Sequence, residues 1–452
     1  MFARWLYTIV FYLLTPLIVL RLALRARKAP AYAKRWGERF GFVRPTLSPV
    51  IWVHSVSVGE TLAAVPLIKA LQCRYPDATL AVTTMTPTGS ERVTSIFGDS
   101  VYHCYAPYDL PDVVQRFLQR VRPSVLIIME TELWPNTIHA CAKRGIPVIL
   151  ANARLSKKSA AGYRKARWLA VPMMQELAAI AAQTKADSER FLSLGVAPEK
   201  ISVTGNIKFD LELTDELRAQ ANELRRQWQA GNERPIWLAA STHAGEDEQV
   251  LTAFAAVRRK LPEVLLVLVP RHPERFDGVA EQCGSMGFSV SRRSILLDAN
   301  QSDATQSEAT QNEAVPIAPA VLPVTTDILL GDTMGELLVF CGASDLVFVG
   351  GSLVAVGGHN VIEPAAWGKP VLSGPHVFNF TEATQLLLDA GGMLICEDVD
   401  ALAEAATGLL TTSNVADNNQ CQAMGQAALV VTESNRGALA RLQNIIASLV
   451  PR

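Results

Sequence analysis

The chain has 452 residues, of which 49% are hydrophobic and 19% are charged. This composition is typical of folded domains and excludes extensive disorder, and the length is sufficient for two domains of ordinary size. A formal net charge of −1 provides no overall field that would recruit nucleic acid. The seven cysteines include no CxxC pair and the seven histidines no HxxxH pair, so we expect neither a disulfide framework nor a protein-held metal.

Residues 1–28 are predicted to form a membrane anchor. Residues 5–20 carry no charge, and sixteen helical residues span about 24 Å, less than the roughly 30 Å of a hydrocarbon core. Whether the segment crosses the membrane with help from its flanks or lies in the interface stays open. The run is followed by basic residues, with Glu38 as the single acid among them: Arg21, Arg25, Arg27, Lys28, Lys34, Arg35 and Arg39. By the positive-inside rule, we expect the rest of the chain in the cytoplasm.

After the anchor, short apolar runs rich in β-branched residues alternate with amphipathic runs. This alternation predicts parallel sheets that helices cover on both faces. The strands expected in the first half are residues 50–53, 80–84, 125–129, 148–151, 180–182 and 201–203. After a polar connection, expected to be helical, at residues 211–232, the pattern restarts with residues 236–240, 264–269, 346–349 and 371–372.

We therefore predict an α/β fold with two doubly wound, Rossmann-like domains. The first domain is expected at residues 29–215 and the second at residues 216–452, with a cleft between the carboxyl ends of their strands. An insertion at residues 298–319 repeats a short polar pattern without aromatic side chains. We expect it to be a disordered surface loop.

The first candidate site follows the first predicted strand. Ser57 and Glu60 have the spacing of a capping box at the start of a helix. On the local sequence alone, this structural role is the favoured interpretation. The alternative is a functional role for Glu60, because α/β folds place their sites at the carboxyl ends of strands.

Charged residues follow other predicted strands as well. Glu130 and Glu132 come after a strand of the first domain, where two acids are rarely buried without partners. Lys208 follows another strand and, taken alone, would be an ordinary surface lysine. In the second domain, Arg271 can bind a phosphate or carboxylate bidentately, and His272 can donate to a phosphate or a base edge.

The most informative stretch is a glycine-rich segment at residues 348–364. A buried strand runs into two Gly-Gly pairs and then into Asn360 and Glu363, which have the spacing of an N-cap and its partner. Glycines let the backbone approach a bulky anion, and the free N–H groups of a helix start attract negative charge. We interpret the segment as a site for the phosphate and ribose of a nucleotide. The alternative is an ordinary turn, in which Glu363 serves only the cap.

Asp398 and Asp400 form a DxD, the pattern by which many nucleotide-sugar transferases hold a metal ion. They precede the helical pattern of residues 401–410, and the favoured interpretation is that Asp400 caps this helix. We expect no metal at this position.

Four segments together carry a family resemblance: residues 55–61, 129–136, 270–275 and 348–364. They occur in the order found in 3-deoxy-D-manno-octulosonic acid (Kdo) transferases, and the chain resembles this family over nearly its whole length. These enzymes of lipopolysaccharide synthesis move Kdo from CMP-Kdo onto a lipid A precursor. The resemblance implies a GT-B architecture, attachment to the cytoplasmic face of the inner membrane, and catalysis without a metal cofactor.

The resemblance also implies roles for individual residues. Glu60 is the expected catalytic base, which takes the proton of the acceptor hydroxyl in a direct displacement with inversion. Glu130, with Glu132 as second choice, is expected to support the reacting centre, and Lys208 to place positive charge near the Kdo carboxylate or the departing phosphate. Backbone groups around Gly335 are expected to read cytosine. The implied donor site consists of Pro270, Arg271, His272, Met334, Gly335, Glu336, Asn360, Val361, Ile362 and Glu363.

Two other functions stay open at this point. A GT-B transferase that uses a UDP-sugar would need a cradle for a second phosphate. A non-catalytic lipid or nucleotide binding module would leave the acids at the strand ends unexplained. Exchange of UDP for CMP in a binding assay separates the first alternative from the leading interpretation.

Overall fold

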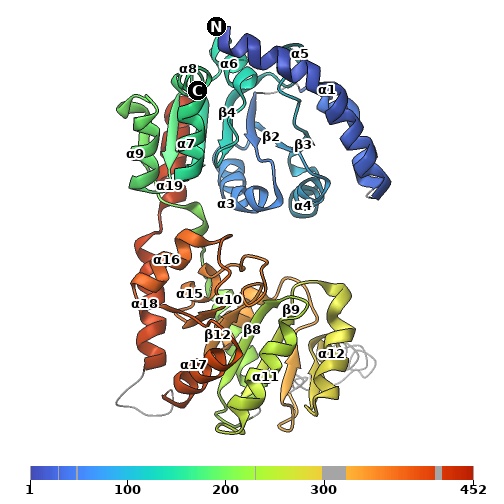
Figure 1. Ribbon diagram of the computed structural model, residues 1–452, viewed down its shortest axis with the longest axis vertical. Helices are drawn as coiled ribbons and strands as arrows, with labels where there is room; N and C mark the ends of the chain where they lie inside the picture. The colour runs from blue at the N-terminus through green and yellow to red at the C-terminus, as the bar shows by residue number, and fades with distance from the viewer. Residues whose placement is uncertain are drawn as a thin grey trace, which may run out of the picture. The chain divides into compact units, whose positions relative to one another are not determined.

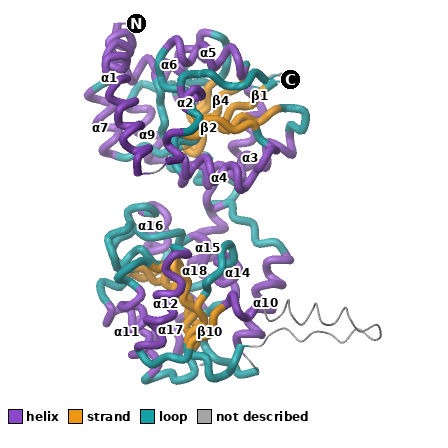
Figure 2. The backbone as a smooth tube through the Cα atoms, turned by 90° about the vertical axis from the view of Figure 1, so that its right-hand side faces the viewer, coloured by secondary structure: helices purple, strands orange, loops and turns teal. Residues whose placement is uncertain are grey.

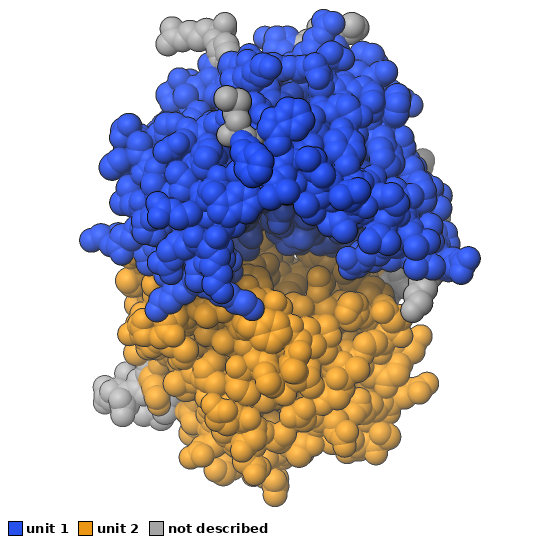
Figure 3. Space-filling view, turned by 45° about the horizontal axis from the view of Figure 1, so that its top comes forward, with its two compact units in different colours: residues 1–210, 435–452 blue, residues 211–434 orange. Residues whose placement is uncertain are grey.

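The structure is a computed structural model that describes residues 2–28, 30–46, 49–229, 231–297, 322–412 and 420–450. The chain divides into two compact units, which Figure 3 colours separately: unit 1 contains residues 1–210 and 435–452, and unit 2 contains residues 211–434. Each unit is built around a seven-stranded sheet. The predicted α/β fold of two Rossmann-like domains is confirmed, whereas the insertion at residues 298–319 lies outside the described residues.

The sheet of unit 1 is parallel, with the strand order β3-β2-β1-β4-β5-β6-β7. Alternate side chains of a strand point to opposite faces. Trp52 and its neighbour Leu126 therefore join one core, and Val53 and its neighbour Ile127 join the other. The strands are β1 (Val50–His54), β2 (Thr79–Thr84), β3 (Tyr102–Tyr105), β4 (Pro123–Met129), β5 (Val148–Ala153), β6 (Ala179–Ala182) and β7 (Ile201–Val203).

Helices cover both faces of this sheet (Figure 1). Phe117 of α5 packs into the core on one face, and Leu67 of α3 packs into the core on the other. The helices of unit 1 are α1 (Phe2–Lys28), α2 (Trp36–Arg39), α3 (Val58–Arg74), α4 (Pro87–Phe97), α5 (Pro111–Val121), α6 (Pro135–Lys143), α7 (Lys157–Lys165), α8 (Arg167–Gln175), α9 (Lys185–Ser193) and α19 (Ala438–Leu449).

Unit 2 repeats this plan with the order β10-β11-β9-β8-β12-β13-β14, and Figure 2 shows its strands surrounded by helices. Its strands are β8 (Ile236–Thr242), β9 (Leu265–Pro270), β10 (Val290–Arg292), β11 (Ile328–Leu330), β12 (Leu346–Val349), β13 (Val371–Ser373) and β14 (Met393–Ile395). Its helices are α10 (Asp215–Gln229), α11 (Asp247–Arg258), α12 (Phe276–Ser285), α14 (Leu337–Ala343), α15 (Ile362–Ala366), α16 (Thr381–Asp389), α17 (Val399–Thr412) and α18 (Gln420–Ser434).

The end of the second domain differs from the prediction. We expected residues 216–452 to form one domain, but the chain returns to unit 1 at residue 435. The reason lies in α19, because Leu442 and Ile446 are fully buried in the same core as Ile127 of β4. The Asp210 carboxylate also accepts hydrogen bonds from the N–H groups of Gly437 and Leu439, at the start of this helix.

The expected apolar helix at the N-terminus is present as α1, which has 27 residues and includes Pro16. Within the described part of the chain, it is the one helix long and apolar enough to cross a membrane. It packs against the rest of unit 1, alongside α5 and α6 (Figure 1).

Candidate functional site

The loop after β1 places Glu60 in the first turn of α3. Ser57 is the N-cap, and its hydroxyl oxygen accepts from the Glu60 N–H at 3.3 Å and donates to the Glu60 carboxylate at 2.8 Å. The other carboxylate oxygen accepts from the Val56 N–H at 2.8 Å. The predicted cap at Ser57 is confirmed, and Glu60 bonds back as expected, although to the N–H of Val56 and not to that of Ser57. It holds the Glu60 side chain, which is only 8% exposed, in one orientation.

The surroundings of Glu60 bring its titration close to neutral pH. Burial raises the pKa of Glu60 to about 7, and the Glu132 and Glu130 carboxylates act in the same direction. The Val56 N–H and the Ser57 hydroxyl favour the charged form and act against this shift. A carboxyl group with this pKa can both accept and release a proton at neutral pH, which is what a general base requires.

Glu130 and Glu132 lie in the loop directly after β4. The backbone of Glu130 is left-handed, with φ 56°, which is sparsely populated by residues other than glycine. Such conformations cost on the order of 1–3 kcal/mol and cluster at active sites. Burial raises the pKa of Glu132, whose carboxylate accepts from the Trp134 indole at 3.3 Å. Trp134 packs edge-on against His54 at the end of β1, with ring centroids 4.6 Å apart.

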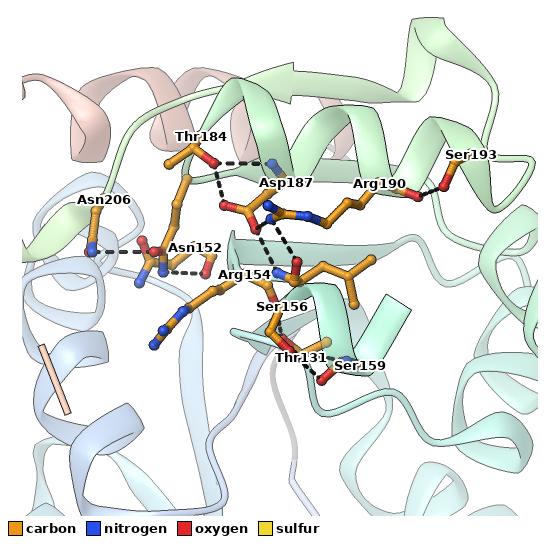
Figure 4. A network of polar contacts seen from close by, with 12 residues as sticks. Thr131, Asn152, Arg154, Ser156, Ser159, Thr184, Asp187, Arg190, Ser193 and Asn206 are labelled. Atoms are coloured by element: carbon orange, nitrogen blue, oxygen red, sulfur yellow. Dashed lines mark hydrogen bonds and ion pairs between the residues drawn. The ribbon is translucent and has the colours of Figure 1, made fainter. Parts of the chain in front are cut away.

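Polar contacts fix the loop that carries these two acids. Thr131, which lies between them, donates from its hydroxyl to the backbone carbonyl of Arg154, after β5. Asp187 of α9 accepts from the next N–H group, that of Leu155, at 2.8 Å, and Arg190 donates to the Leu155 carbonyl at 2.9 Å. Figure 4 shows Asp187 and Arg190 on one side of Arg154, in the loop after β5, and Thr131 on the other. The network ties the loops after β4 and β5 together.

Lys208 approaches the same acids from the end of β7. The side chain of Asn152 accepts from the Ile207 N–H at 3.1 Å and so positions the turn that carries Lys208. The Lys208 ammonium lies 3.4 Å from the Glu130 carboxylate. The structure therefore brings together the four side chains that were predicted to be catalytic: Glu60, Glu130, Glu132 and Lys208.

In unit 2, three histidines and an arginine lie close together after the ends of strands. Nε2 of His243, after β8, lies 2.8 Å from Nε2 of His359, and the two rings stack at 5.0 Å. His272, after β9, packs edge-on against His243 at 5.3 Å. Burial lowers the pKa of His359 to about 4, and the Arg271 guanidinium acts in the same direction. His359 is therefore neutral at pH 7. It was missed by sequence reasoning, although it stands between the second Gly-Gly pair and Asn360.

Asn360 and Glu363 interact at the start of α15. The helix α15 has five residues, and its N-cap is Val361. The Asn360 side chain accepts from the Ile362 N–H at 3.0 Å and donates to the Glu363 carboxylate at 2.9 Å. Burial raises the pKa of Glu363, whereas Asn360 and Arg271 favour its charged form. The N-cap residue lies one position later than predicted, at Val361, but Val361 makes no side-chain capping bond. The predicted pairing of Asn360 with the helix start and with Glu363 is confirmed.

The first half of the glycine-rich loop surrounds an anion that belongs to the chain itself. Glu246 is fully buried, and its carboxylate accepts from the N–H groups of Gly351, Ser352 and Leu353 at 2.6, 3.0 and 2.9 Å. A side chain at Gly350 would lie 2.8 Å from the same carboxylate, which explains the glycine. Glu246 therefore occupies these three amides, which form no phosphate cradle. Phosphate binding by the backbone at the start of α15 stays a prediction.

Comparisons with known proteins identify the family. A family model described as 3-deoxy-D-manno-octulosonic-acid transferase (kdotransferase) matches residues 34–211. The chain is 42% identical to 3-deoxy-D-manno-octulosonic acid transferase of Haemophilus influenzae, over 99% of both chains. It belongs to the Kdo transferase family. The Bordetella pertussis enzyme of the same name is 36% identical, over 97% of both chains.

The fold agrees with this assignment. A glycosyltransferase from Rickettsia africae is 12% identical in sequence, and its structure matches with a TM-score of 0.54, over 90% of this chain and all of that one. At this identity, the likeness concerns the fold alone. It supports the GT-B architecture that was expected from the sequence.

The predicted nucleotide loop of this Kdo transferase family member follows β11. Gly335 has φ 92°, a conformation that favours glycine, and Met334 beside it is 60% exposed. The Glu336 carboxylate pairs with Arg293 at 2.7 Å, and this pair lowers the pKa of Glu336. The loop borders a cavity of about 670 Å³ beside α10 and α14. A role for Met334, Gly335 and Glu336 in binding cytosine stays a prediction.

The DxD has a structural role at a position other than the one expected. Asp398, not Asp400, caps α17, because its carboxylate accepts from the Ala401 N–H at 2.9 Å. The helix begins at Val399, two residues before the predicted start, so the cap moves with it. Within the described residues, no group of three or more His, Cys, Asp or Glu side chains is arranged to hold a metal ion.

Proposed function

We propose that the protein is a glycosyltransferase of lipopolysaccharide inner-core synthesis that moves Kdo from CMP-Kdo onto a lipid A precursor, lipid IVA. Family membership over the whole chain supports the Kdo transfer reaction. The observation that carries the chemistry is the buried Glu60 carboxyl, because its pKa of about 7 suits a general base.

In the proposed reaction, the acceptor hydroxyl oxygen attacks the anomeric carbon of Kdo while Glu60 takes its proton. The bond between the anomeric carbon and the phosphate oxygen breaks, and CMP leaves with the electron pair. A single displacement of this kind inverts the anomeric configuration. Glu130 holds Lys208 at 3.4 Å, so the ammonium is fixed beside the acids. Its role is to stabilise negative charge that develops on the reacting groups.

The donor is assigned to unit 2. Arg271 supplies the positive charge, and the neutral His359 ring can donate or accept a hydrogen bond. Glu363 lies beside Arg271 and Asn360 and is proposed to bind the ribose hydroxyls. Pro270 is the last residue of β9, and Arg271 follows directly after the strand. Because CMP carries one phosphate, these groups are proposed to neutralise the leaving group without a metal ion.

The protein is further proposed to act at the cytoplasmic face of the inner membrane. The apolar helix α1 supports attachment to lipid, since between Phe2 and Leu20 no charged side chain is exposed. Attachment would keep the protein close to an acceptor that itself resides in the membrane.

The direct test is mass spectrometry of the product formed by the purified full chain from CMP-Kdo and lipid IVA. The expected product gains Kdo, with inverted anomeric configuration by NMR, and it forms equally well with EDTA present. Transfer from a UDP-sugar but not from CMP-Kdo would overturn the assignment of the donor. Loss of transfer in EDTA, restored by a divalent metal, would overturn the metal-free mechanism.

A further inference from the structure

One face of α1 is fastened to unit 1 along much of its length. The Thr8 hydroxyl, which is buried, donates to the Asn136 side chain at 3.1 Å, and the Tyr12 hydroxyl donates to the Asp112 carboxylate at 2.6 Å. Further along, Phe11 and Ile18 pack against a buried cluster of Tyr108, Leu110 and Val113. Leu22, a turn beyond, is buried as well. These contacts reach from the second turn of the helix to its last third.

The opposite face of α1 is apolar and exposed. Its large side chains recur every three or four residues, which places them on one side of the helix. Phe2 is 82% exposed and Leu13 is 73% exposed. The face consists mainly of Phe2, Trp5, Ile9, Leu13, Leu17 and Leu20. An apolar stripe of this length marks a surface that contacts something other than water.

The fastened face argues against a helix that crosses the membrane. A crossing would take residues 5–20 into lipid and away from the domain, which stays in water. The hydrogen bonds of Thr8 and Tyr12 would then be lost, and Leu110 and Val113 would be uncovered. In the observed arrangement, the centre of the apolar run lies beside Asp112, a carboxylate that cannot enter the hydrocarbon at acceptable cost.

Charges at both ends of the stripe fit an anionic lipid surface. Near its start, Trp168 of α8 lies beside Phe2 and Leu6 and is itself 51% exposed. Five exposed cations precede or flank this tryptophan, and residues 157–168 contain no acid: Lys157, Lys158, Arg164, Lys165 and Arg167. Near the other end of the stripe, Arg21, Arg25 and Arg27 are exposed. Tryptophan and basic side chains are the groups that favour the headgroup layer.

The geometry points to an in-plane membrane helix: α1 lies flat on an anionic bilayer, clamped to unit 1, with its exposed face in the outer part of the hydrocarbon and Trp168 among the headgroups. Both ends of α1 then lie on the same side of the membrane. This inference rests on the membrane attachment that forms part of the proposed function. It adds the orientation of the helix and the residues of α7 and α8 that complete the lipid surface.

The orientation is tested by the side of the membrane on which the N-terminus lies. An epitope tag ahead of residue 1 should react with antibody in inverted inner-membrane vesicles but not in intact spheroplasts. A reaction in spheroplasts would show that α1 crosses the membrane and would overturn the inference. Activity of the tagged enzyme on detergent-dispersed acceptor is measured in parallel. This measurement distinguishes a wrong orientation of α1 from a wrong assignment of the function.

The lipid face is tested by flotation with vesicles that contain phosphatidylglycerol. Leu13→Glu should weaken binding at least tenfold without loss of the fold, because a charge in the centre of the stripe opposes insertion. Val430→Glu places the same charge at an exposed apolar position on α18 and should leave binding unchanged. Equal binding of wild type and Leu13→Glu would overturn the inference. So would a soluble dimer that Leu13→Glu dissociates and that never binds vesicles, because the occupant of the face would then be a second copy.

Discussion

Two glutamates at corresponding places in the two units differ in how completely the backbone satisfies them. Glu60 follows the first strand of unit 1 and Glu246 the first strand of unit 2, each preceded by glycine and each at the start of a helix. The Glu60 carboxylate accepts from one backbone N–H and one hydroxyl and lies near two further acids. The Glu246 carboxylate accepts from the N–H groups of Gly351, Ser352 and Leu353 and also from that of His243.

The difference shows how one fold produces a reactive acid and a structural acid. The Glu246 carboxylate is held by four backbone N–H groups that tie two distant segments together, which is a structural role. A buried carboxylate with few donors and like charges nearby exchanges its proton near neutral pH. The fold therefore determines where each glutamate lies, and the number of hydrogen-bond donors around its carboxylate determines whether the glutamate is reactive or structural.

The largest effect is expected from Glu60→Gln. The amide keeps the shape of the side chain but cannot take a proton, so transfer should fall by about 10²–10⁴, whereas CMP binding should persist. Ser57→Ala is the matched control: it removes the cap at a cost of about 0.5–2 kcal/mol but leaves the carboxylate. Transfer rates and CMP affinity of both folded variants are compared with those of wild type. A Glu60→Gln enzyme with nearly wild-type rate would reduce Glu60 to a cap.

Glu246→Gln should instead damage structure. The amide group replaces one acceptor oxygen by a donor that faces backbone N–H groups, and a lost hydrogen bond to a charged group costs about 1.5–3 kcal/mol. Amide hydrogen exchange at Gly351, Ser352 and Leu353 should accelerate accordingly. Glu248→Gln, at an exposed position on the same helix, should change stability by no more than about 0.5 kcal/mol. Unchanged exchange in Glu246→Gln would contradict the structural role of this acid.

The raised pKa of Glu60 should be evident in the pH dependence of both transfer and stability. Since the base must be charged, transfer should rise about tenfold per pH unit below pH 7 and level off above it. Stability should show the opposite trend. A raised pKa means that folding favours the protonated Glu60, so its contribution is complete below its usual value of 4.5 and is lost as pH rises through about 7. The free energy of unfolding of wild type and of Glu60→Gln, measured between pH 5 and 8, isolates the contribution of Glu60. Parallel dependences of this free energy on pH would refute the raised pKa.

The smallest effect concerns a third acid at a helix start. Asp398→Ala should cost about 0.5–2 kcal/mol, because it removes the cap of α17. Asp400→Ala lies inside the first turn and should stay within about 0.5 kcal/mol of wild type. Thermal unfolding of the two variants provides the comparison, and a reversed order would restore the prediction made from the sequence.

Local patterns predicted much of this structure. The β-branched runs gave the central strands, and the spacing of Ser57 and Glu60 gave the capping box, because both depend on neighbours within a few residues. The strands β3, β10, β11 and β14 were missed. In β3, His103 and the tyrosines on either side of it form no apolar run. At Asp398, the pattern indicated a cap but not the residue that forms it.

The remainder depends on contacts between distant parts of the chain. Nothing near Glu246 in the sequence indicates that three of its four backbone partners lie 105 to 107 residues away. The glycines around the Glu246 carboxylate are evident in the sequence. However, a glycine-rich backbone that binds an internal carboxylate has the same pattern as one that binds a nucleotide phosphate. The return of α19 to unit 1 was hidden for a similar reason, because an amphipathic helix does not reveal which core it joins.

That return has a consequence for the order in which the protein is made. Unit 1 begins to leave the ribosome first, yet Leu442 and Ile446 fill part of its core. At about 5–20 residues per second, translation of the intervening unit takes roughly 10 to 45 s. During this interval unit 1 exists as a nascent domain with an open groove on its sheet, while α1 has already emerged. A ribosome that stalls before residue 435 therefore releases a chain whose first domain lacks a core helix, even though all its sheet strands are present.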